Sequence, residues 1–127
     1  MAATTIVAEH HDRAMQVVDM TFNCGDGDPA DKPTDHKYYG FLVQCRIQFD
    51  STKPTDAFDM TIKDEFGTDL LNGQGQNIST SGTEVVITQA DLDNGMACSG
   101  TLTVDIDNAS NSGSTANKLY LYIARYQ

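Results

Sequence analysis

Nucleophilic catalysis requires a serine or cysteine that a histidine can activate. This chain has few histidines that could form such a pair. Its three histidines are His10, His11 and His36, and all of them lie in polar segments that favour exposed loops. The sequence contains no G-x-S-x-G turn, no H-E-x-x-H helix and no glycine-rich phosphate loop. We therefore expect no catalytic residues and no enzymatic activity.

An acidic loop at residues 25–31 offers the oxygen ligands that calcium prefers. Its candidate ligands are Asp26, Asp28 and Asp31. The loop does not follow the EF-hand pattern, because Asp31 and Lys37 stand where that pattern has glycine and glutamate. We therefore favour a solvated loop with no bound metal or other cofactor, and keep the three aspartates only as weak candidates.

Pairs of carboxylates could also act as acid and base in glycoside hydrolysis. Asp59, Asp105 and Asp107 lie at outward positions of predicted strands. Among 18 acidic residues some pair always looks suitable, so the spacing alone selects none of them.

The cysteines Cys24, Cys45 and Cys98 are far apart in the sequence and odd in number. They form no C-x-x-C spacing of the kind that binds zinc or carries out redox chemistry. We expect three buried, reduced thiols in a protein made in a cytosol.

Acidic residues outnumber basic ones by 18 to 8, which gives the 127-residue chain a net charge of -10 and a pI of about 4.3. Without a cluster of lysine and arginine, binding to nucleic-acid phosphates and to anionic membranes is disfavoured. The first residues contain neither a basic region nor a long apolar one, so we expect no signal peptide. No apolar run approaches the ~20 residues of a membrane-spanning helix.

Apolar and polar residues alternate in short stretches along the chain, and this period predicts β-strands. In the clearest stretch, residues 41–49, the odd positions are apolar and Leu42 interrupts a polar even face, so we expect the odd positions to face the core. Residues 64–67 predict a turn closed by a left-handed glycine. Further strands are expected at residues 6–8, 15–22, 58–62, 69–71, 83–88, 101–107 and 118–126.

About seven to eight short strands without helices between them predict an all-β fold, an antiparallel β-sandwich or barrel. A parallel sheet would need crossover helices that the sequence does not supply. We divide the chain into an N-terminal arm at residues 1–12 and a single β domain at residues 13–127. The arm carries Ile6 and Val7, which could add a strand to a neighbouring chain.

Tyrosines mark the clearest candidate for a partner-binding surface. Tyr120, Tyr122 and Tyr126 share one face of the last predicted strand, whose other face is already apolar. Such a strand is either central between two layers or covered by a partner chain. Tyrosine suits an interface because its ring buries area while its hydroxyl remains hydrogen-bonded. Tyr38 and Tyr39 could extend the same patch.

Residues 54–71, P-T-D-A-F-D-M-T-I-K-D-E-F-G-T-D-L-L, resemble a pattern found in small virion proteins of tailed bacteriophages. Residues 83–85, 100–104 and 118–122 are also similar, so the resemblance extends over residues 51–125. The N-terminal portion with its acidic loop departs from the pattern. The matched residues are turn and core positions, and they imply a fold element without implying a binding site.

The resemblance implies a virion structural protein, and capsid decoration (cement) is the role that we expect. Copies would assemble in the host cytoplasm, bind the outer capsid surface, stabilise contacts between major capsid subunits and associate with one another, for which a trimer is one arrangement. Negative charge suits a position outside the packaged nucleic acid. A tail, connector or fibre-associated module and a carbohydrate-binding or calcium-stabilised adhesive module stay open as alternatives.

Overall fold

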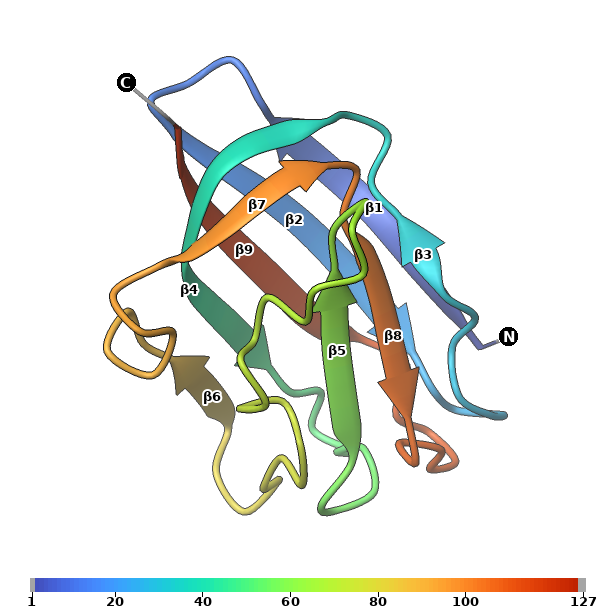
Figure 1. The fold of residues 1–127 in the computed structure, drawn as a ribbon. Coiled ribbons are helices and arrows are strands. Elements are labelled where there is room, and N and C mark those ends of the chain that lie inside the picture. Colours follow the sequence, from blue (N-terminus) through green and yellow to red (C-terminus); the bar gives the residue numbers. More distant parts are fainter. Residues whose placement is uncertain (1, 126–127) are drawn as a thin grey trace.

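Two antiparallel sheets face each other across an apolar core in the computed structural model, which describes residues 2–125 (Figure 1). The expected all-β antiparallel fold is therefore confirmed, and of the two expected architectures, sandwich and barrel, the structure has the sandwich. Among the described residues there is no helix long and apolar enough to span a membrane. The nine strands of this part of the chain are β1 (Ala3–His10), β2 (Met15–Asn23), β3 (Lys32–Pro33), β4 (Tyr38–Gln48), β5 (Asp59–Lys63), β6 (Glu84–Ile87), β7 (Met96–Gly100), β8 (Thr103–Asp107) and β9 (Asn117–Arg125).

The large sheet has the strand order β1-β2-β9-β4-β6, and β7 pairs with the first half of β4. Alternate residues of its two central strands, β2 and β9, point inward and are fully buried. This strict alternation follows from the period of two in the sequence. The inward residues of these strands are Val18, Met20, Phe22, Leu119, Leu121 and Ile123.

The small sheet has the order β3-β8-β5 and covers the inner face of the large sheet (Figure 1). Met60 of β5 and Val104 of β8 belong to the same buried cluster as the inward residues of the large sheet. The rings of Phe22 and Phe58 meet between the layers, with centroids 6.3 Å apart. Burial of each such side chain stabilises the fold by about 1.5–3 kcal/mol.

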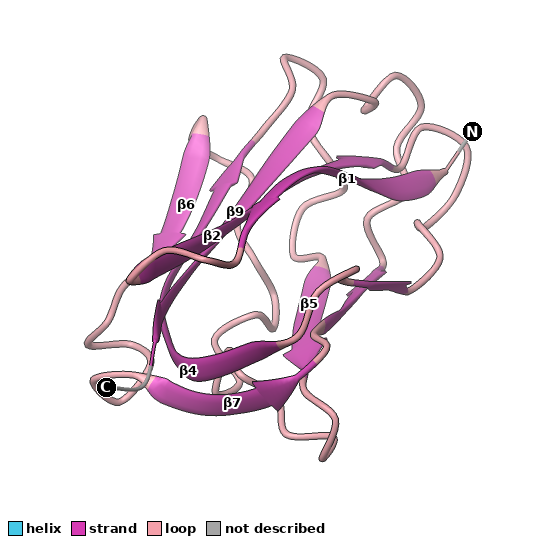
Figure 2. Cartoon of the chain, turned by 90° about the horizontal axis from the view of Figure 1, so that it is seen from above, coloured by secondary structure: helices cyan, strands magenta, loops and turns pink. Residues whose placement is uncertain are grey.

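A β-bulge in β4 changes which of its residues face the core. The register with β9 shifts between Leu42 and Gln44, which leaves Val43 as the extra residue. After the bulge Ile47 is buried as expected, but before it Leu42 is fully buried and Phe41 is 40% exposed. The expectation that every odd position faces the core is therefore wrong ahead of the bulge. Figure 2 shows β4 and β7 curving together, which agrees with the extra twist that bulges introduce.

The N-terminal segment forms an edge strand, β1, which pairs with β2 over most of its length. Its far end is fastened by Glu9, whose carboxylate accepts hydrogen bonds from the Tyr38 hydroxyl at 2.6 Å and the Asp35 amide at 2.8 Å. Bonds to an ionised acceptor are among the stronger ones in proteins. Over the described residues, the segment expected as an arm thus belongs to the large sheet.

Aspartate carboxylates hold several loops by accepting hydrogen bonds from backbone N–H groups. Asp50 accepts from the amides of Thr115 and Ala116, each at 3.1 Å, and Asp56 accepts from the amide of Thr80 at 2.9 Å. These backbone bonds lower the pKa of both carboxyl groups, because they favour the charged form. The loops therefore find partners for backbone groups that no strand pairs.

The structure differs from the expected strands at three further places. The alternation does not predict β3 or β7. The return strand expected at residues 69–71 is absent from the described structure: Asp69 forms an isolated bridge, and Leu70 and Leu71 lie in a turn. Both leucines are fully buried. The expected glycine turn is confirmed, because Gly67 has a φ of 79° and its amide donates to the Asp64 carbonyl at 3.0 Å.

Gly40 lies where β4 and β9 approach too closely for a side chain, since a Cβ there would be 2.0 Å from the Ala124 carbonyl oxygen. We expect Gly40→Ala to lower the free energy of unfolding by about 3 kcal/mol or more, measured by denaturant titration, because backbone cannot move aside cheaply. Gly82→Ala is the matched control, since its nearest neighbour would be 3.7 Å away. Equal stability of the two variants would contradict this close approach.

Candidate functional site

The outer face of the large sheet carries partly buried side chains in two cross-strand rows on β2, β9 and β4. In one row the register places Tyr120 between Asp19 and Arg46. The next row has Tyr122 at its centre and lies one pleat further along β9. The six residues of the two rows, which we call the tyrosine face, are Val17, Asp19, Gln44, Arg46, Tyr120 and Tyr122.

The structure brings together only some of the tyrosines that the sequence singled out. Tyr120 and Tyr122 lie side by side on the tyrosine face, as the alternation predicts. Tyr38 is 0% exposed and donates its hydroxyl proton to Glu9, so its expected place on a partner surface is wrong. Burial raises the pKa of the Tyr38 hydroxyl, which stays protonated. Tyr126 lies outside the described residues.

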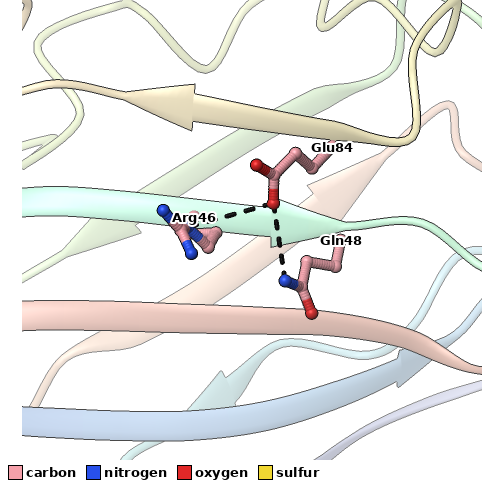
Figure 3. Close-up of polar contacts among 3 residues, drawn as sticks. All are labelled: Arg46, Gln48 and Glu84. Carbon is pink, nitrogen blue, oxygen red and sulfur yellow. Dashed lines mark hydrogen bonds and ion pairs between the residues drawn. The ribbon is translucent and has the colours of Figure 1, made fainter.

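Arg46 is held at the β6 side of the tyrosine face by a polar contact. The Glu84 carboxylate lies 3.9 Å from the Arg46 Nε and accepts a 3.4 Å hydrogen bond from the side-chain amide (Nε2) of Gln48 (Figure 3). The two charged side chains are 38% and 40% exposed, so this ion pair contributes little to stability. Within residues 2–125 no group pairs with the terminal guanidinium nitrogens of Arg46, which remain available as donors.

Asp19 provides the opposite charge on the other side of Tyr120. Its Oδ1 atom is buried and has no hydrogen-bond partner within the described part of the chain. A carboxylate oxygen that has lost its water without gaining a donor raises the free energy of the free protein. A cation brought to this carboxylate would therefore be favourable.

Three exposed aromatic residues form a second surface, which we call the aromatic corner: Tyr39, Phe41 and Phe66. Tyr39 and Phe41 alternate on the outer side of β4 ahead of the bulge, while Phe66 lies at the tip of the turn that follows β5. This turn is joined to β7, because the Glu65 amide donates to the Ser99 carbonyl at 3.2 Å and the Ser99 hydroxyl to the Glu65 carboxylate at 2.8 Å. Ser99 in turn pairs with Tyr39.

The aromatic corner is the most exposed aromatic surface described in this chain. Tyr39 is 47% exposed, Phe41 40% and Phe66 77%. Sequence reasoning identified Tyr39 but assigned Phe41 to the core, because it did not include the bulge. For Phe66 the available signal was its position in a four-residue turn, where an apolar side chain has no core to enter.

The two residues expected on an N-terminal arm have separate environments. Ile6 packs against the edge of the core, whereas Val7 is the extra residue of the bulge in β1 and is 54% exposed. A single exposed apolar residue is common on protein surfaces. Neither residue is part of the tyrosine face or the aromatic corner.

Of the three weak calcium candidates, Asp28 holds a loop in the structure and Asp31 shares a hydrogen bond with Asp105. The Asp28 carboxylate accepts three backbone hydrogen bonds, from Asn108 at 2.9 Å, Ala109 at 2.7 Å and Ser110 at 3.0 Å. It is therefore engaged as a clamp on the loop between β8 and β9. Across residues 2–125 no group of three or more acidic, histidine or cysteine side chains is placed to hold a metal ion.

The outer face of the small sheet brings several carboxylates together. Burial, a hydrogen bond with Asp31 and the charge of Asp107 raise the pKa of Asp105 to about 6. Asp59, opposite Asp107 in the register, accepts hydrogen bonds from the Asn77 amide and the Asn108 side chain, both at 2.9 Å. The hydrogen bonds of Asp59 thus support loops, and over residues 2–125 no pocket opens beside these groups.

Cys24, Cys45 and Cys98 are free and buried, as expected. Burial raises the pKa of Cys45 to about 12 and that of Cys98 to about 11. Since the thiolate is the reactive form, these thiols are core residues with little reactivity.

No known family model, curated protein or solved structure matches this chain.

We expect Asp28→Ala to destabilise the protein by about 2 kcal/mol, because three backbone donors lose a charged acceptor. Denaturant unfolding measures the change, and Asp12→Ala, at an exposed position in the turn between β1 and β2, is the control. Calcium should leave the melting temperature of the unmodified protein unchanged. A calcium-dependent rise in melting temperature that Asp28→Ala abolishes would contradict the clamp and support a metal site.

The raised pKa of Asp105 predicts a pH dependence of stability. The folded protein holds this proton up to about pH 6, whereas the unfolded chain releases it near the ordinary value of 3.8, so stability decreases as pH rises through that interval. We expect Asp105→Asn to be more stable than the unmodified protein at pH 7.5, by about 0.5 kcal/mol given solvent screening. Thermal melts should show this gain shrinking below pH 6, and a gain independent of pH would disprove the assignment.

Proposed function

We propose that this protein is a capsid decoration protein of a tailed bacteriophage, which docks on the assembled shell through the aromatic corner. The observation that carries the proposal is the exposure of Tyr39, Phe41 and Phe66, together with the hydrogen bonds that join the turn of Phe66 to Ser99, the partner of Tyr39 on β7. Exposed aromatic side chains that collect on one surface typically mark a protein interface. The resemblance of residues 54–71 to phage virion proteins supports the choice of a shell as partner.

The size of the aromatic side chains makes the corner an effective anchor. Each aromatic residue can bury roughly 150–250 Å² at an interface. At roughly 25 cal/mol per Å², covering the exposed parts of three such residues gives a few kcal/mol before the cost of association. Single contacts of this strength are weak, but many copies on one shell need only modest individual affinity.

The backbone beneath the corner is well supported, which favours binding without rearrangement. The turn carrying Phe66 is fixed by the Asp64 carboxylate, which accepts from the amides of Phe66 at 3.0 Å and Ser99 at 3.3 Å. Tyr39 lies on a strand paired on both sides, with β7 and β9. Preorganised side chains lose less entropy on binding.

The charge distribution also supports a position on the outside of a particle. A net charge of -10 disfavours contact with packaged nucleic acid and keeps free copies apart in solution. The three aromatic side chains are uncharged, so they could enter an interface without desolvating a charge.

Co-sedimentation with shells assembled from a phage major capsid protein tests the proposal, and the capsid protein to use is one encoded in the same genome as this chain. We expect the unmodified protein to pellet with shells, and Tyr39→Ser and Phe66→Ser each to weaken binding about tenfold or more, as interface anchors do. Val7→Ser is the matched control, since Val7 is 54% exposed, between Tyr39 and Phe66, but lies on the edge strand β1, which β2 and β9 separate from β4.

Two outcomes would overturn the proposal. Failure of the unmodified, folded protein to bind shells would exclude decoration of that capsid. A count of chains in purified particles that finds only a few copies would instead place the protein in the tail or connector.

A further inference from the structure

The charges on the tyrosine face are arranged asymmetrically about β9. Asp19 lies on one side of Tyr120 and Arg46 lies on the other, in the same cross-strand row. Neighbouring strands are about 4.8 Å apart, so each charge lies at roughly that distance from the line of β9. A surface with opposite charges on either side of a line is complementary to itself after a half-turn about that line.

We infer that the tyrosine face pairs with the same face of a second copy of this chain, about a twofold axis parallel to β9. A half-turn about this axis exchanges the two sides of the face and keeps each residue at its level along the strand. Asp19 of one copy therefore meets Arg46 of the other, and the reverse contact forms at the same time. Tyr120 and Tyr122 lie nearest the axis and pack against their own counterparts.

The electrostatic state of the free chain favours this occupant over an unrelated one. The second copy brings a guanidinium to the Asp19 carboxylate, whose buried Oδ1 has no donor among residues 2–125. It also brings a carboxylate to the terminal nitrogens of Arg46, while the Arg46 Nε stays beside Glu84. Both groups thus gain charge-assisted contacts that the isolated chain does not provide.

In the rows on either side of Tyr120, every residue except Lys118 would meet an acceptable neighbour in the second copy. In the Tyr122 row, Val17 of one copy would meet Gln44 of the other. In the row on the other side of Tyr120, Thr21 of one copy would meet Gln48 of the other. Lys118 lies on β9 between Thr21 and Gln48, so the Lys118 side chains of the two copies would approach each other near the axis. Repulsion there limits affinity, so removal of this charge should strengthen the dimer.

The extent of the face predicts the strength of the dimer. The three rows centred on Tyr122, Tyr120 and Lys118, at roughly 6.8 Å spacing, and five strands at roughly 4.8 Å spacing cover roughly 20 by 24 Å. This is less than the ~800 Å² that each partner typically buries in a stable complex. We therefore expect reversible association with a dissociation constant of about 10–100 μM.

The dimer would give the proposed shell attachment two contact points, and this consequence alone rests on the proposed function. Because the half-turn keeps each residue at its level along β9, both aromatic corners would lie toward the same end of the dimer. Two corners on one shell would bind with avidity.

Sedimentation equilibrium of the full chain over a range of concentrations tests the pairing without any shell. We expect a monomer–dimer equilibrium that weakens with added salt. Asp19→Arg and Arg46→Asp should each weaken association about tenfold or more, since each places like charges opposite each other. Lys118→Gln should strengthen it. The matched controls are Asp107→Arg and Lys63→Asp, which reverse single charges on the outer face of the small sheet.

Mixing the two reversed chains separates pairing between copies from attraction within one chain. The Asp19→Arg chain presents two positive charges on the face and the Arg46→Asp chain presents two negative charges, so the mixture should form a heterodimer although each chain alone is monomeric. Circular dichroism and thermal melting establish that both variants are folded.

Three results would overturn the inference: an unmodified protein that stays monomeric at about 1 mM, a trimer, or a dimer indifferent to both reversals and to mixing. Because no shell is present in these measurements, their failure leaves the shell-binding test independent. Failure of shell binding, in turn, leaves the dimer measurement unaffected.

Discussion

The bulge at Val43 is the constraint on which the two candidate surfaces depend. It reverses the inward and outward sides of β4, so that Leu42 fills the core while Tyr39 and Phe41 stay outside. It also lies where β4 exchanges its neighbour, from β7 in the first half to β6 in the second. Without the extra residue a one-residue slip would turn Phe41 inward and expose Leu42, and the aromatic corner would not exist. The tyrosine face lies beyond the bulge, where β4 pairs with β9 and β6.

The strong negative charge of the chain has a structural explanation as well as a functional one. Several carboxylates act as acceptors for loop amides, among them Asp28, Asp50, Asp56 and Asp59. Such acceptors allow long connections without helices to be ordered, since each buried or partly buried amide needs a partner. The same residues resemble metal ligands or catalytic acids in the sequence, where their hydrogen bonds are invisible. Carboxylates that order the loops also add to the negative charge, which disfavours binding to nucleic-acid phosphates.

Alternation was sufficient to predict the fold where each strand has one buried face, as in β2, β5, β8 and β9. It failed at β4, because a bulge is a single extra residue that a strict period cannot include, and at β7, whose side chains are mostly small. The sequence identified Tyr120 and Tyr122 as neighbours because two residues of one strand share a face. It could not place Tyr38 against Glu9, or Asp19 and Arg46 on opposite sides of Tyr120, since these arrangements join strands distant in the sequence and depend on strand order.

The most direct test of the whole account is a cryo-electron microscopy reconstruction of a phage particle that carries this chain. The account predicts density for the β-sandwich on the outer shell, in pairs related by twofold symmetry across β9, with the β4–β7 corner seated on the capsid subunits. Copies confined to the tail, or copies on the shell that attach through the small sheet and leave Tyr39 and Phe66 in solvent, would contradict it.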